Sequence, residues 1–183
     1  MASIDPPLAS AARTSSAFAT ALDLPADWFE PFYRRPLFQL SLLHYRPPPR
    51  PEDLEVGVVE HQDTGAFTML LQDGTGGLEI RNRAGEWIAA SSVPGAYVIN
   101  IGDSMMRWTN GRFVSTPHRV VNRSVRPRYS VPFFVNPDYD VAIEPLPHLV
   151  PAGEAPRFAP LHNGQYMVDF YDKGMKYLRR GAS

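Results

Sequence analysis

The hydrophobic pattern of this chain changes its period near residue 37. Before that point, residues 8–22 are rich in alanine, and their apolar positions recur at nearly helical spacing, which predicts a modestly amphipathic helix. Residues 26–33 follow a proline and predict a second, short helix that ends before Pro36. From residue 37 onward apolar and polar residues alternate, which is typical of half-buried β-strands. We therefore expect a helical N-terminal segment at 1–36, followed by strands.

Short strands then follow one another to residue 137. The alternation and the turn residues predict them at 37–45, 54–62, 66–72, 78–81, 86–91, 96–102, 113–122 and 128–135. We expect residues 97–101 to be well buried, residues 103–109 to form a helical turn, and Asn110-Gly111 to form a β-hairpin. Pro132 predicts a bulge or a sheet edge. Such closely spaced strands indicate an all-β core, an antiparallel sandwich or barrel without βαβ units.

The remainder of the chain, residues 138–183, is expected to be a proline-rich tail that ends in a helix. Residues 138–163 lack a clear period, and residues 164–180 place aromatic side chains amid charges, which predicts a closing helix. The predicted organisation is thus a helical segment at 1–36, a β core at 37–137 and a tail at 138–183, within one domain of 183 residues.

Composition narrows the range of functions. A hydrophobic content of 44%, a charged content of 20% and a net charge of −1 without a basic run argue against nucleic acid or an acidic membrane as a partner. Without cysteine, thiolate nucleophiles and iron–sulfur clusters are excluded, and His and carboxylate remain as metal ligands. No apolar run reaches 18 residues and no signal pattern is present, so we expect a cytoplasmic protein.

One candidate for metal chemistry is the sequence His61-Gln62-Asp63, at the end of a predicted strand. Because side chains of a strand alternate between faces, His61 and Asp63 point the same way and could occupy adjacent positions on a metal ion. About 0.5 such His-x-acid matches are expected by chance in a chain of this composition, so a solvated strand end is the alternative. Two histidines and one carboxylate on one face of an octahedron are typical of non-haem Fe(II) oxygenases.

The best candidate for the third ligand is His118, at the opening of an apolar strand 57 residues after His61. Strands this far apart become neighbours when a chain has passed once around a two-sheet roll. His44, His148 and His162 lie at a strand end or in the proline-rich tail. The alternative for His118 is a core histidine bonded to a backbone carbonyl.

Ten residues later, Arg128-Tyr129-Ser130 places an arginine and a serine on one face of a strand. Burying a guanidinium in a sheet interior costs desolvation free energy unless a carboxylate pairs with it, and its planar arrangement of donors suits bidentate pairing. These two residues are therefore candidates for binding a carboxylate. The alternative is an arginine that faces outward from an edge strand.

These residues together resemble the non-haem Fe(II) and 2-oxoglutarate-dependent dioxygenases of the isopenicillin N synthase-like superfamily. The resemblance covers residues 37–137. The matching residues are His61-x-Asp63, His118, Arg128-x-Ser130, Asn136-Pro137, Leu70-Leu-Gln-Asp, Gly76-Gly77-Leu78, Gly85-Glu-Trp87, Val93-Pro-Gly95, Asn100-Ile-Gly-Asp103 and Trp108-Thr-Asn-Gly-Arg112.

The resemblance implies a double-stranded β-helix (jelly roll) in which His61, Asp63 and His118 hold Fe(II). It implies that 2-oxoglutarate chelates the iron and that its distal carboxylate pairs with the Arg128-x-Ser130 residues. Tyr45 matches the tyrosine of the family's Asn-x-Tyr motif, which reaches the same carboxylate, although Leu43 stands at the Asn position. Phe134 matches a position that often lines the substrate pocket; a core phenylalanine is the alternative.

The implied reaction uses O₂ and 2-oxoglutarate to hydroxylate, desaturate or cyclise a small organic molecule, with release of succinate and CO₂. Only 36 residues precede the core, so we expect a short version of the family. Three alternatives remain open: a 2-oxoglutarate-independent oxidase of the same family, a catalytically silent jelly-roll binding module, and a sugar-binding sandwich without metal.

Overall fold

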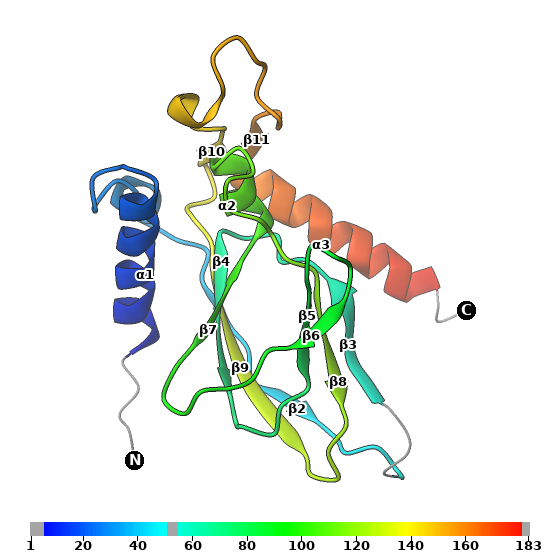
Figure 1. Ribbon diagram of the computed structural model, residues 1–183. Coiled ribbons are helices and arrows are strands. Elements are labelled where there is room, and N and C mark those ends of the chain that lie inside the picture. The colour runs from blue at the N-terminus through cyan, green and yellow to red at the C-terminus, as the bar shows by residue number, and fades with distance from the viewer. Residues whose placement is uncertain (1–5, 51–54, 181–183) are drawn as a thin grey trace.

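Two antiparallel β-sheets face each other in the computed structural model, which describes residues 6–50 and 55–180 (Figure 1). The first sheet has the order β1-β9-β4-β7, and β2 also pairs with β9. Its strands are β1 (Gln39–Leu40), β2 (Leu43–Tyr45), β4 (Phe67–Gln72), β7 (Val98–Ile101) and β9 (Arg128–Val135). The second sheet has the order β3-β8-β5-β6. Its strands are β3 (Glu55–His61), β5 (Leu78–Arg81), β6 (Trp87–Ala89) and β8 (His118–Asn122). The predicted all-β core is confirmed.

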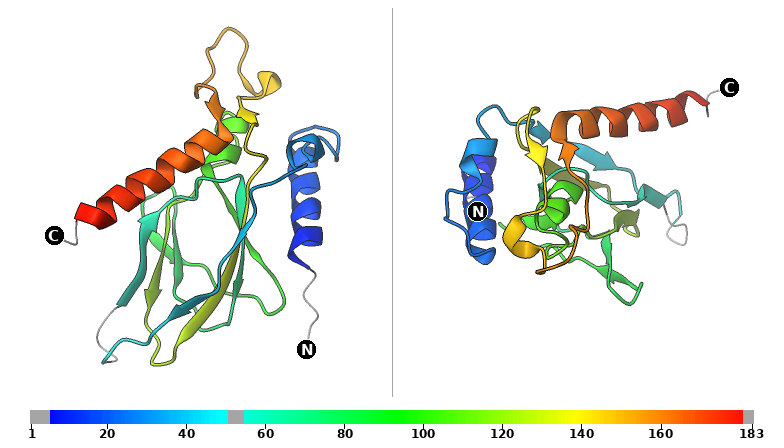
Figure 2. Two further views of the ribbon diagram at one scale, coloured as in Figure 1. Left: turned by 180° about the vertical axis from the view of Figure 1, so that it is seen from behind. Right: turned by 90° about the horizontal axis from the view of Figure 1, so that it is seen from above.

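Helices cover the outside and one end of these sheets. They are α1 (Pro7–Ala21), α2 (Asp103–Trp108), α3 (Asn163–Arg180) and the 3₁₀ turns η1 (Glu30–Phe32) and η2 (Pro147–Leu149). A small hairpin-like pair, β10 (Ala142–Ile143) with β11 (Leu161–His162), precedes α3. Figure 2 shows α1 on one side of the sheets and α3 on the other. Within the described residues, no helix has both the length and the apolar character needed to cross a bilayer.

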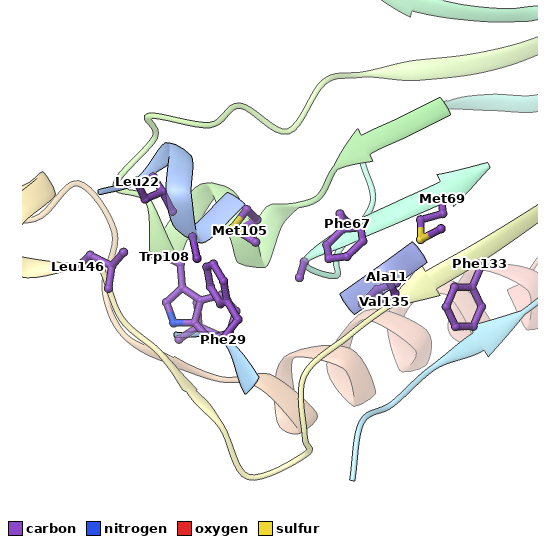
Figure 3. Packing of buried hydrophobic residues seen from close by; sticks show 13 residues of the cluster. Ala11, Leu22, Phe29, Phe67, Met69, Met105, Trp108, Phe133, Val135 and Leu146 are labelled. Atoms are coloured by element: carbon purple, nitrogen blue, oxygen red, sulfur yellow. The ribbon is translucent and has the colours of Figure 1, made fainter. Parts of the chain in front are cut away.

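The apolar core lies between the first sheet and the N-terminal helices, outside the space between the two sheets (Figure 3). Alternate residues of β4 and β9 face in opposite directions, so Phe67 and Val135 pack outward against the α1 side. Phe29, which is 1% exposed, packs against Trp108 with ring centroids 5.4 Å apart. The inner face of this sheet is consequently free to carry polar groups.

Several predicted elements are shorter than their patterns suggested. The second helix is only the 3₁₀ turn η1, since Pro31 removes a backbone donor inside the predicted range. The strand predicted at 37–45 is interrupted at residues 41–42, and that at 113–122 begins only at His118. Leu54, at the start of another predicted strand, lies outside the described residues. The predicted deep burial of residues 97–101 is wrong, because β7 is an edge strand and Ile99 is 39% exposed.

The hairpin predicted at Asn110-Gly111 is wrong. These residues follow the C-terminal end of α2, where the N–H of Gly111 donates to the carbonyl of Met106 at 2.8 Å. Both have positive φ, +50° at Asn110 and +85° at Gly111. A helix C-terminus and a tight hairpin both need left-handed residues, so this dipeptide suits either one.

Pro132 does not mark a sheet edge. It lies in β9, which has neighbours on both sides. The carbonyl of Pro132 accepts a hydrogen bond from the N–H of Ser41. In an antiparallel sheet the backbone N and C=O of one residue point toward the same neighbouring strand. The missing donor of Pro132 therefore faces residues 41–42, where β1 and β2 are interrupted.

Candidate metal centre

Two neighbouring strands bring His61, Asp63 and His118 together. His61 is the last residue of β3 and lies directly opposite His118, the first residue of β8. Asp63 follows two residues after His61, and its Oδ1 lies 3.6 Å from Nε2 of His61 and 3.7 Å from Nε2 of His118. One ligand atom from each of the three residues lies within 4.8 Å of the others. The three side chains thus face a common point between the sheets.

The other ring nitrogen of each histidine, Nδ1, forms a hydrogen bond with the backbone. Nδ1 of His61 lies 2.9 Å from the carbonyl of Val59, and Nδ1 of His118 lies 3.1 Å from that of Thr116. A carbonyl can only accept, so each Nδ1 donates its proton to the backbone, and Nε2 is the ring nitrogen that is left to face the other ligands. Burial lowers the pKa of His118, although the nearby Asp63 carboxylate opposes that shift. Burial thus favours the neutral imidazole of His118, the form that can ligate a metal.

Asp63 is buried at 7% exposure, and its two oxygens have different surroundings. Oδ2 accepts from Oγ1 of Thr68 at 2.6 Å and from Nδ2 of Asn100 at 2.8 Å. Oδ1 is directed at the two histidines. Thr68 and Asn100 lie directly opposite each other on β4 and β7, so one cross-strand pair binds the carboxylate oxygen that does not face the histidines.

This donor set suits Fe(II). Two neutral imidazole nitrogens and one carboxylate oxygen, on one side of an open space, are the ligands of non-haem iron oxygenases. Each of the three side chains is also oriented by at least one hydrogen bond from an atom that does not face the other ligands, which is usual where side chains hold a metal. The chemistry and the arrangement of the donors therefore fit an iron site.

Arg128 is 0% exposed and lies on the inner face of the first sheet. Its guanidinium donates to the carbonyl of Gly76 at 2.6 Å, to Oγ of Ser130 at 3.1 Å and to Oε1 of Gln72 at 2.9 Å. The ring of Tyr45 lies 4.7 Å from Cζ, a cation–π distance. Burial lowers the pKa of Arg128. Among the described residues no carboxylate lies within 4.0 Å of this cation, and its hydrogen-bond partners are a carbonyl, a hydroxyl and an amide oxygen. The carboxylate of Asp73 acts on it from a greater distance.

A single cavity of about 340 Å³ connects the two polar groups. It lies between the sheets and is lined by His61, Asp63 and His118 at one place and by Arg128, Ser130 and Tyr45 at another. Phe134 lines it as well, together with apolar residues such as Leu70 and Val120. Every site residue that the sequence suggested thus borders one space.

Comparisons with known proteins agree with this geometry. The family model described as "2OG-Fe(II) oxygenase superfamily" matches residues 37–137, more than half of the chain. The chain belongs to the 2OG-Fe(II) oxygenase superfamily. Its β core is the double-stranded β-helix of that superfamily, and the predicted resemblance is confirmed.

The relatives of this chain carry different names. The chain is 40% identical over 146 residues to the 2-oxoglutarate-Fe(II) type oxidoreductase hxnY of Emericella nidulans, covering 78% of this chain and 42% of the relative. It is 41% identical over 136 residues to feruloyl CoA ortho-hydroxylase 1 of Arabidopsis thaliana, covering 74% and 37%. The crystal structure of a full-length Neurospora crassa protein in complex with alpha-KG and thymine is similar at a TM-score of 0.80 and 29% identity, covering 91% and 53%. The chain therefore spans about two fifths of the length of these two curated relatives.

Thr68 and Asn100, the partners of Asp63, were not predicted from the sequence. Both are polar residues on the inner side of mostly apolar strands, Phe67–Gln72 and Val98–Ile101. Because a buried polar side chain nearly always has a hydrogen-bond partner, that position was a signal for a polar group inside the roll. Gln72, which accepts a hydrogen bond from Arg128, was likewise not predicted from the sequence.

Proposed function

We propose that this chain binds Fe(II) through His61, Asp63 and His118 and binds 2-oxoglutarate through the Arg128 region of the same cavity. The proposed reaction oxidises a small organic molecule with O₂ and converts 2-oxoglutarate to succinate and CO₂. One observation carries the proposal. A fully buried arginine without a carboxylate partner shares a cavity with a His-Asp-His cluster among the described residues.

The side chains of the centre fix how a metal ion is held. Hydrogen bonds to backbone carbonyls hold His61 and His118 in the tautomer whose Nε2 can ligate. Thr68 and Asn100 occupy Oδ2 of Asp63, which leaves Oδ1 as a single ligand atom. Three protein ligands leave further positions for small molecules, and bound iron supplies the redox chemistry by which O₂ can react with an organic substrate.

Arg128 and its neighbours supply a site for the far carboxylate of a dicarboxylic acid. Three neutral acceptors already orient the guanidinium, so little side-chain entropy is lost when an anion binds. Ser130 adds a hydroxyl on the same face, and Tyr45 covers the guanidinium and excludes water. In such a buried place the charge-assisted pair between arginine and carboxylate is strong.

Two alternatives use the same residues differently. In a 2-oxoglutarate-independent oxidase, Arg128 and Ser130 would hold a carboxylate of the substrate itself. In a silent binding module, the cavity would hold a ligand without turnover. The similar Neurospora crassa structure, which contains alpha-KG, favours the co-substrate assignment. The relatives named for different substrates leave the substrate of this chain to be identified.

The test is a titration of the Fe(II)-loaded protein with 2-oxoglutarate under argon, followed by exposure to O₂ and measurement of succinate. We expect saturable binding and succinate release, and the loss of both iron binding and succinate in His118→Ala. His162→Ala is the matched control, because His162 lies in β11, outside the cavity. Iron binding without any affinity for 2-oxoglutarate would replace the proposal by the oxidase or the silent module.

A further inference from the structure

A second cavity, of about 280 Å³, lies on the α3 side of the same metal centre. It shares Leu43, His61, Asp63, Pro132 and Phe134 with the first cavity. Its other wall includes Met167, Phe170 and Tyr171 of α3. Arg128, Ser130 and Tyr45 border only the first cavity. Two separate spaces therefore meet at His61 and Asp63.

Hydrogen bonds hold α3 over this second cavity. The hydroxyl of Tyr171 donates to Oε1 of Gln39 on β1 at 3.0 Å, and both residues line the cavity. On the other side, Oγ1 of Thr64 lies 3.4 Å from Sδ of Met167. The helix thus bridges β1 and the segment that carries Asp63, and a molecule in this cavity would lie between α3 and the metal ligands.

The chemistry of the cavity wall favours an uncharged molecule. Among its described lining residues none is Lys or Arg, and apart from the phenol of Tyr171 the only ionisable side chains are those of His61 and Asp63. Phe134, Phe170 and Tyr171 offer aromatic surface. The remaining polar lining groups are amides and hydroxyls, those of Gln39, Ser41, Gln62, Thr64 and Asn136. Asn136 is 3% exposed, and its Oδ1 has no hydrogen-bond partner among the described residues.

The net charge of the loaded centre also favours an uncharged molecule over a carboxylate. Fe(II) with one carboxylate ligand and a doubly charged 2-oxoglutarate has a net negative charge. A second carboxylate placed beside this centre would lose its water without gaining a Lys or Arg partner among the described lining residues. An amide, hydroxyl or ring N–H loses less on leaving water and can bond to the amide and hydroxyl groups of the wall.

We infer that the cavity under α3 is the substrate side of the centre and that it takes an uncharged aromatic or heterocyclic molecule with N–H or O–H groups in preference to a carboxylic acid. The inference rests on the proposed function, in which the first cavity holds 2-oxoglutarate. It goes further by naming the chemical class of the second ligand and the helix that contacts it.

The test uses matched pairs of an aromatic acid and its primary amide. The probes are 2-naphthoate with 2-naphthamide, cinnamate with cinnamamide, and indole-3-carboxylate with indole-3-carboxamide. Each is titrated by calorimetry into the full chain loaded with redox-inert Zn(II), with and without saturating 2-oxoglutarate. With 2-oxoglutarate present, we expect at least one amide to bind, and to bind about tenfold or more tightly than its acid, a difference of about 1.4 kcal/mol.

Two lysine variants locate the binding. Ser41→Lys places an ammonium group at the cavity and should reverse the preference, so that the acid binds more tightly than the amide. Leu40→Lys is the matched control, because Leu40 is adjacent, 52% exposed and outside the cavity. It should keep the preference of the parent protein.

Acids that bind as tightly as their amides in the parent protein, or amides that all fail to bind, would overturn the inference. A preference that Leu40→Lys changes as much as Ser41→Lys would also overturn it. The proposed function fails separately, if the Zn(II)-loaded protein does not bind 2-oxoglutarate. In that case the comparison of amides with acids is still decided by the titrations without 2-oxoglutarate.

Discussion

Asp63 carries two oxygens that cannot exchange roles. Oδ2 is occupied by Thr68 and Asn100, while Oδ1 lies 3.6 and 3.7 Å from the two histidine Nε2 atoms. A carboxylate without these donors could rotate and present either oxygen or both. The cross-strand pair therefore fixes the direction of the ligand before any metal binds, and this preorganisation should contribute to metal affinity.

Thr68→Val removes the hydroxyl that binds Asp63 and nearly preserves the volume of the side chain. We expect metal affinity to fall by about 10–100-fold, since partners of ligating side chains contribute on that order. Competition of Co(II) with a chelator measures this affinity directly and needs no turnover. Thr68→Ser keeps a hydroxyl and should restore most of the affinity. Equal Co(II) affinity in Thr68→Val and in the parent would show that Thr68 does not contribute to metal binding.

Arg128→Lys keeps the charge but loses the planar fork, and Ser130→Ala removes only one hydroxyl. We expect the arginine variant to lose about 2–5 kcal/mol of 2-oxoglutarate affinity and the serine variant about 1–2 kcal/mol. Metal affinity should change little, because neither side chain belongs to the His-Asp-His cluster. Anaerobic titration of the iron-loaded variants gives both values. An unchanged affinity in Arg128→Lys would contradict the co-substrate assignment.

Among the elements, the start of α2 is built onto the backbone of the metal-binding segment. The N–H of Asp103 donates to the carbonyl of Asp63 at 2.7 Å, and that of Gly102 donates to Ala66 at 3.0 Å. A Cβ added to Gly102 would lie 2.2 Å from the carbonyl oxygen of Gly65. Two chain segments therefore approach here as closely as only glycine permits.

Gly102→Ala should destabilise the fold by about 1–3 kcal/mol, as overpacking against fixed backbone does, and should also weaken metal binding by displacing Asp63. Its φ of −103° is allowed for alanine, so the effect would come from lack of space alone. Urea unfolding and the Co(II) competition measure the two effects. Gly153→Ala is the control: no atom lies within 4 Å of the added Cβ, but φ is +83°. It should lose about 1 kcal/mol of stability and no metal affinity.

Across the whole molecule, the C-terminal helix is joined to the metal side through Tyr166. Its hydroxyl donates to Oδ2 of Asp103, the first residue of α2, and Nε of Arg107 lies 3.6 Å from the same oxygen. Burial, with the Asp103 carboxylate, raises the pKa of Tyr166 to about 12. Because Asp103 also binds the backbone of Asp63, this contact connects α3 with the metal-binding segment.

Tyr166→Phe should lower stability at neutral pH and loosen α3, seen as faster amide exchange across the helix. The folded state keeps the phenol proton to about pH 12, whereas the ordinary pKa is 10.0. The stabilisation is therefore fully present below pH 10 and is lost as the pH rises toward 12. The difference in free energy of unfolding between parent and variant should shrink over that interval. A difference that stays constant with pH would contradict this role of the hydroxyl.

The sequence by itself determined the local features of this protein. Alternation with a period of two predicted the strands and the helical pattern at 8–22 predicted α1, because these periods arise from the backbone itself. His61-x-Asp63 and Arg128-x-Ser130 were predictable for the same reason, since residues two apart share a face. The family resemblance joined these separate pairs to His118 and to a jelly roll.

Tertiary structure alone decided which neighbours each residue has. Asn110-Gly111 fits a hairpin or a helix end, and the choice depended on the packing of α2. Pro132 is accepted in a central strand because the interruption at residues 41–42 lies opposite it. Thr68 and Asn100 reach Asp63, and Tyr171 reaches Gln39, through contacts between separate elements of the fold. Such contacts depend on sheet register and helix placement, which arise from the packing of the whole chain and have no local period to reveal them.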